Sequence, residues 1–148
     1  METFEPKQEA QIWQRVFSQP EFRGSAVHPL LLSSMEAIAA YRQLANVLTG
    51  TQKELAKRLL QEEQATFDTL RGLSRLAGKG WEEAKSLPAP KAQTGRLLET
   101  CYHRAKKAAA EYTARSAEPE FGLVFQRLAK RQGEHCALIA RLLGSLKP

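Results

Sequence analysis

Two short polar segments of the chain carry residue types that bind metal ions or move protons. Glu63 lies three residues before Thr66, and Gln132 lies three residues before His135. Residues at this spacing share one face of a helix, so the members of each pair would point the same way. A carboxylate and an imidazole can ligate iron or manganese, or they can form a buried ion pair. Glu63, Gln132 and His135 are therefore the candidate site residues.

The two polar segments belong to an internal repeat. Tyr41 matches Tyr112 at an offset of 71 residues, and Glu63 matches Gln132 at an offset of 69. The difference of two residues falls in the turn between the matched positions, where insertions are tolerated. A repeat of this length predicts two similar helical hairpins.

Apolar residues at helical spacing predict four long helices around these segments. The expected helices cover residues 30–48, 51–77, 94–116 and 119–146. Gly50 and Thr51 predict a tight turn after the first helix, and Glu118 and Pro119 predict another after the third. Since the sequence has no alternating apolar pattern with a hairpin dipeptide, we expect no strands. The predicted fold class is all-α.

The lengths of the connections decide between topologies. Two short turns predict two antiparallel hairpins. The segment from Gly78 to Gln93 can extend about 50 Å at ~3.3 Å per residue. A 19-residue helix is only about 28 Å long at ~1.5 Å per residue. A long crossover along the bundle is therefore within reach, and it is preferred here to simple up-down-up-down order.

Residues 1–29 are predicted to be an arm that precedes the bundle of residues 30–148. Within the arm, apolar residues at helical spacing predict a short helix over residues 7–17, which Pro20 ends, and residues 24–29 are interpreted as a linker. The apolar face of this helix consists of Ile12, Trp13, Val16 and Phe17. We expect the face to pack on the bundle, and a surface for a partner is the alternative, because aromatic side chains serve as anchors in both.

The paired hairpins, each with a tyrosine in one helix and a Glu-x-x-His position in the next, resemble the rubrerythrin and ferritin-like diiron superfamily. The resemblance covers residues 30–146 and implies a ferritin-like four-helix bundle. The helix predicted in the arm adds a short extra N-terminal helix to this fold. In that family each hairpin supplies a glutamate about seven residues before the tyrosine and a Glu-x-x-His motif. The resemblance therefore implies ligand positions for a pair of iron or manganese ions.

Most of these implied ligand positions hold other residues. Only Glu63 and His135 are retained, which is two of the six positions. The replaced positions are Ser34, Thr66, Ala105 and Gln132. The resemblance therefore implies a degenerate diiron site.

Neighbouring carboxylates could replace the missing ligands only after a shift in the predicted helix phase. Glu36 and Glu99 are rotated from the predicted core by roughly 200° and 120°, so we expect both outside it. Glu62 and Glu134 are rotated by roughly 100–200°. Three interpretations of Glu63 with His135 remain open: a buried ionic or hydrogen-bonded pair, a single metal site completed by water, and a dinuclear centre.

Composition narrows the possible partners. The net charge is +6 and the pI is about 9.5. A basic surface attracts anions, but the chain has no groove-reading element, so nucleic-acid binding is not favoured. No apolar run is long enough for a membrane span, and the acidic N-terminus does not resemble a signal peptide. Cys101 and Cys136 lie far apart in sequence, which indicates free thiols in a reducing compartment, most simply the cytoplasm.

Together these observations favour a non-catalytic ferritin-like protein with a degenerate diiron site. We expect a role in interaction or small-ligand binding, no bound cofactor, and a homodimer, since two-fold dimers are the commonest oligomers. The alternative is a metal-dependent oxidoreductase of the rubrerythrin type, in which iron or manganese is held by Glu63, His135 and recruited carboxylates. Binding of an anionic partner by the basic surface is a third interpretation.

Overall fold

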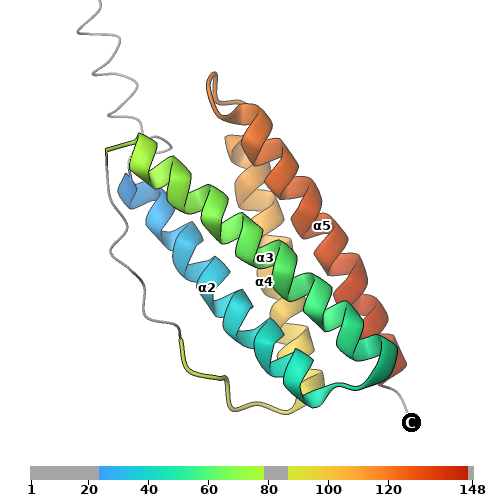
Figure 1. Cartoon of the computed structure of the whole chain (residues 1–148). Helices are drawn as coiled ribbons and strands as arrows, with labels where there is room; N and C mark the ends of the chain where they lie inside the picture. Colours follow the sequence, from blue (N-terminus) through green and yellow to red (C-terminus); the bar gives the residue numbers. More distant parts are fainter. Residues whose placement is uncertain (1–23, 79–86, 147–148) are drawn as a thin grey trace, which may run out of the picture.

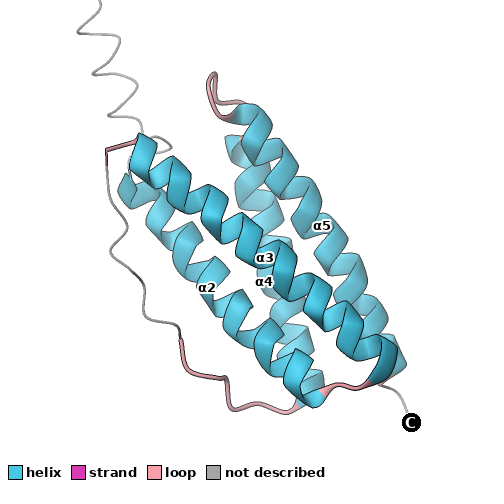
Figure 2. Ribbon diagram, viewed as in Figure 1, coloured by secondary structure: helices cyan, strands magenta, loops and turns pink. Residues whose placement is uncertain are grey.

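The computed structural model describes residues 24–78 and 87–146, so the helix expected over residues 7–17 lies outside the described part of the chain. Four helices make up the described part (Figures 1 and 2): α2 (Gly24–Val47), α3 (Gly50–Leu76), α4 (Thr94–Arg115) and α5 (Gly122–Ser145). The described residues contain no strand. The predictions of an all-α fold class and of four helices are therefore confirmed.

The four helices form a bundle built from two hairpins. α2 packs mainly against α3, and α4 packs mainly against α5; the remaining helix contacts join α2 to α4 and α3 to α5. Figure 1 shows that the two members of each hairpin run in opposite directions. α3 ends and α4 begins at opposite ends of the bundle, so these two helices run in the same direction. Simple up-down-up-down order would make them antiparallel.

α2 begins earlier than the apolar pattern predicts. Residues 24–29, interpreted from sequence as a linker, are the first part of α2, and Pro29 lies inside the helix. Proline has a φ that suits a helix, but it lacks a backbone N–H and therefore removes one helical hydrogen bond. Val27, Leu30 and Leu31 are buried in one cluster with apolar side chains of the other three helices. Burial of this apolar surface offsets the missing hydrogen bond.

A layer of polar side chains divides the core along its length. One apolar cluster lies toward the α2–α3 turn and includes Tyr41, Leu44, Leu59, Leu98 and Ile139. The other lies toward the opposite end and includes Leu30, Leu70, Tyr112, Phe125 and Leu128. The polar layer between them consists of Ser34, Glu63, Thr66, Arg104, Gln132 and His135. Each helix contributes to the layer at the point where its two apolar stretches meet.

Gly122, the first residue of α5, occupies a position where a side chain does not fit. A Cβ atom there would collide with the backbone carbonyl oxygen of Ser116, whereas a Cβ at Gly133 in the same helix would meet open space. We expect Gly122→Ala to lower the free energy of unfolding by about 1–3 kcal/mol. Gly133→Ala should raise it by up to ~1 kcal/mol, because alanine favours the helix. Urea denaturation measures both, and equal effects of the two substitutions would contradict the collision.

Candidate functional site

All four helices contribute side chains to the polar layer. Ser34 comes from α2, Glu63 from α3, Arg104 from α4, and Gln132 and His135 from α5. Glu63, Gln132 and His135 are fully buried, and the side chain of Arg104 is 11% exposed. The structure therefore brings together the three candidate residues that the sequence predicts, with an arginine among them.

Arg104 is the residue of the polar layer that the sequence pattern does not reveal. Its Nη2 donates hydrogen bonds to Oε1 of Gln132 at 2.7 Å and to Oε1 of Glu63 at 3.3 Å. Its Nη1 donates to the hydroxyl of Ser33 at 3.1 Å. A single guanidinium thus links α4 to the three other helices. The offset of 71 residues pairs Arg104 with Ser33, but a match between repeat positions does not predict a contact, so the sequence carried no signal for it.

The carboxylate of Glu63 is surrounded by donors. Besides Arg104, the hydroxyl of Ser34 donates to Oε2 at 2.7 Å, and the amide Nε2 of Gln132 donates to Oε1 at 3.0 Å. Burial raises the pKa of this carboxyl, but the contact with His135, the positive charge of Arg104 and the hydrogen bonds from Ser34 and Gln132 together outweigh burial. They lower the pKa of Glu63 to about 2. Glu63 is therefore an ionised carboxylate at neutral pH.

His135 lies between two carboxylates. Its Nε2 is 2.9 Å from Oε1 of Glu62, which is hydrogen-bond distance. Its Nδ1 is 3.6 Å from Oε1 of Glu63, which is an electrostatic contact rather than a hydrogen bond. The other oxygen of Glu62 accepts a hydrogen bond from Nε of Arg58 at 3.0 Å. The edge of the imidazole ring also packs on Tyr41, with the ring centroids 6.0 Å apart.

The other acidic residues considered as replacement ligands, and the hydroxyl of Thr66, make contacts away from the carboxylate of Glu63. Glu36, Glu99 and Glu134 are exposed, as the helix phase predicts. Glu62 is rotated from the inward face, as predicted, but it is only partly exposed and contacts His135, because this flank of α3 faces α5. The hydroxyl of Thr66 donates to the carbonyl of Glu62 in its own helix and accepts from the guanidinium of Arg131.

The donor set of the layer does not fit a dinuclear metal centre. In the described part of the chain, no group of three or more His, Cys, Asp or Glu side chains could hold a metal ion. The oxygens of Glu63 already accept three hydrogen bonds, one of them from a cation. A metal ion at this position would also meet the positive charge of Arg104, which repels it strongly in a low-dielectric interior. The positive charge that balances Glu63 is therefore supplied by Arg104.

The two thiols near the layer are not activated nucleophiles. Cys101 is buried, Cys136 is half-buried, and neither forms a disulfide. Burial raises the pKa of the Cys101 thiol to about 12 and also raises the pKa of Cys136. Since the thiolate is the reactive form of cysteine, both side chains are unreactive at neutral pH.

Comparisons of this chain with protein-family models, with curated proteins and with solved structures found no match. No helix in residues 24–78 and 87–146 has both the length and the apolar character needed to cross a membrane.

Proposed function

We propose that this chain is a non-catalytic, ferritin-like four-helix bundle in which Arg104 replaces the metal ions of the family that it resembles. The observation that carries the proposal is the buried guanidinium, bonded at once to Glu63, Gln132 and Ser33. The parallel directions of α3 and α4 support the ferritin-like arrangement, as does the contact between the repeat-related residues Glu63 and Gln132.

In this proposal the polar layer has a structural role. Its hydrogen bonds cross from α4 to α2, α3 and α5, and they form at only one alignment of the two hairpins. Buried polar groups that must all be paired disfavour other alignments, because an unpaired buried charge is costly. The bundle then acts through its surface, in interaction or small-ligand binding and as a homodimer, and it needs no cofactor.

The proposal predicts that the protein binds no stoichiometric iron or manganese. Anaerobic titration of iron(II) and of manganese(II) into the wild-type protein should give no saturable binding. The exposed carboxylate variant Glu134→Ala and the layer variant Glu63→Ala should behave in the same way. Arg104 is the reason, because it supplies the positive charge that a metal ion would bring.

Two outcomes of the titration would contradict the proposal. Binding of about two ions per chain, abolished in Glu63→Ala and kept in Glu134→Ala, would favour the rubrerythrin-type oxidoreductase. Binding of about one ion with the same pattern would favour a mononuclear site. The position of His135 between Glu62 and Glu63 is the observation that favours metal binding as the second candidate function.

A further inference from the structure

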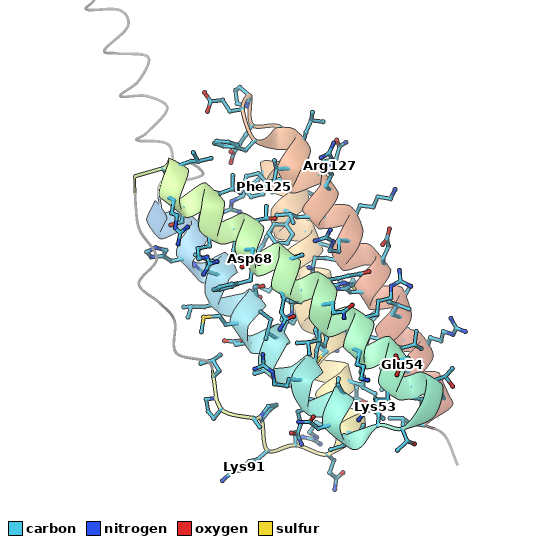
Figure 3. The ribbon with its side chains drawn as sticks, viewed as in Figure 1. Lys53, Glu54, Asp68, Lys91, Phe125 and Arg127 are labelled. Atoms are coloured by element: carbon cyan, nitrogen blue, oxygen red, sulfur yellow. The ribbon has the colours of Figure 1, made fainter. Side chains whose placement is uncertain are left out.

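A cavity of about 280 Å³ opens between α3 and α5, near the end of the bundle where α2 begins. Its lining residues are Thr69 on α3 and Val124, Arg127, Leu128 and Arg131 on α5. No short turn joins α3 to α5, and the two helices pack less extensively than the members of either hairpin. Figure 3 labels Arg127 on α5 and Asp68, beside Thr69, on α3. The cavity is thus a gap at a loosely packed helix pair.

Two exposed leucines lie on α3 and α5, the two helices that line the cavity. Leu123 is 70% exposed and Leu76 is 67% exposed, more than any other large hydrophobic residue in the described part of the chain. Leu123 precedes Arg127 by four residues, and Leu76 follows Thr69 by seven, so each lies on the same helix face as a lining residue. We call the cavity together with Leu76 and Leu123 the α3–α5 groove. Exposed apolar side chains on the helices beside a cavity are typical of an interaction site.

The α3–α5 groove also carries positive charge. Arg131 is held in place by hydrogen bonds to the carbonyl of Glu62 at 3.4 Å and to the hydroxyl of Thr66 at 3.3 Å. Within residues 24–78 and 87–146, neither Arg127 nor Arg131 forms a salt bridge with an acidic side chain. The groove is therefore suited to an apolar segment that carries carboxylates.

We propose that residues 1–23 of the same chain cover the α3–α5 groove. These residues lie outside the described part, so the inference uses their sequence and the place where they join the bundle. Their apolar side chains at helical spacing are Ile12, Trp13, Val16 and Phe17. Their charged residues are the acidic Glu2, Glu5, Glu9 and Glu21 and the basic Lys7, Arg15 and Arg23. The segment therefore carries an apolar face that matches the apolar surface of the groove, and carboxylates that can pair with Arg127 and Arg131.

The connection to α2 makes this placement geometrically possible. The segment joins the bundle at Gly24, and Figure 1 shows that α2 starts at the end where α3 finishes and α5 begins. About 11 residues separate Trp13 from Gly24, and they can span up to ~36 Å at ~3.3 Å per residue. Passing one helix of diameter ~10 Å requires less than this. At an effective concentration of ~1 mM, a local dissociation constant of ~0.1 mM would keep roughly nine chains in ten docked.

Trp13 provides a direct test in the full-length protein. The chain has two tryptophans, so Trp81→Phe leaves Trp13 as the only indole fluorophore. We expect Trp13 in this parent protein to emit at shorter wavelength than a solvated indole and to be protected from acrylamide quenching. The effect should not depend on protein concentration, because the docking is within one chain.

Two groove variants and two matched controls test where Trp13 docks. Leu123→Ser and Arg127→Glu in the parent should shift the emission to longer wavelength and remove the protection. Val47→Ser, an exposed position at the opposite end of the bundle, and Lys107→Glu on α4 should leave both unchanged. All four changes are at exposed side chains, so the fold should survive, and far-UV circular dichroism verifies this.

Three results would overturn the inference. A solvated Trp13 in the parent would show that the segment does not dock. Protection that the groove variants leave intact would place the docking elsewhere. Protection that rises with protein concentration would assign the groove to the segment of a second copy. The inference does not rest on the proposed role of the polar layer, so the metal titration and the fluorescence test can fail separately.

Discussion

Replacing Arg104 with methionine is expected to lower the free energy of unfolding by about 3–5 kcal/mol. Methionine keeps much of the length of the side chain, but it removes three hydrogen bonds and the positive charge opposite Glu63. The buried carboxylate is then left without its cation, and an uncompensated buried charge is strongly destabilising. Urea denaturation at pH 7 measures the loss.

Two comparisons separate the loss of the ion pair from the loss of a long side chain. Lys107→Met, on the exposed face of α4, should change the free energy of unfolding by no more than ~0.5 kcal/mol. The double variant Arg104→Met with Glu63→Leu should recover much of the loss, because no charge is then left unpaired. If Arg104→Met is as stable as the wild-type protein, the buried guanidinium does not hold the layer together and the proposed function fails.

Stability is also expected to fall steeply as the pH is lowered below about 4.5, because of Glu63. The pKa of this carboxyl is about 2 in the folded protein, against an ordinary value of 4.5. As the pH falls, the unfolded chain therefore binds this proton first, and the folded state loses its advantage. The contribution is complete above about pH 4.5 and is lost as the pH falls through 2. At ~1.4 kcal/mol per pKa unit, it amounts to roughly 3 kcal/mol.

The measurement is a series of urea denaturation curves between pH 2 and pH 7. Glu63→Gln removes the titrating group, so its free energy of unfolding should depend less on pH between about 4.5 and 2 than that of the wild-type protein. Glu134→Gln removes an exposed carboxyl and should keep the wild-type dependence. Identical pH dependence in all three proteins would show that Glu63 is not stabilised by its neighbours.

Helical periodicity was sufficient to place Glu63, Gln132 and His135 in the core. The apolar residues that flank the polar positions on the same helix faces, Leu59, Leu70, Leu128 and Ile139, point inward. A helix carries the polar residues between them inward as well. Helical periodicity also placed Glu36, Glu99 and Glu134 outside the core, where the structure has them. Sequence spacing determines the direction of the Cα–Cβ bond, and this direction decides which of these residues point inward.

Helical periodicity could not predict the contacts of Arg104 and Glu62. Both lie on the flank of a helix, where the Cα–Cβ direction leaves the outcome open and the length of the side chain decides it. Arg104 is next to the inward-facing Ala105, and its long stem reaches into the layer, where Glu63 attracts its charge. Glu62 meets His135 because α5 packs beside that flank of α3. Neither contact follows from the local sequence of one helix.

The start of α2 was also decided by packing between helices and not by the local sequence. Gly24 and Pro29 are local signals against a helix, and they led to the prediction of a linker. In the bundle, Val27, Leu30 and Leu31 bury apolar surface against three other helices, and this outweighs the local preference. Spacing along the chain was enough for the four helices and for the residues that point inward. Which flanking charges meet, and where α2 begins, were decided by packing between helices, because those energies come from residues far apart in sequence.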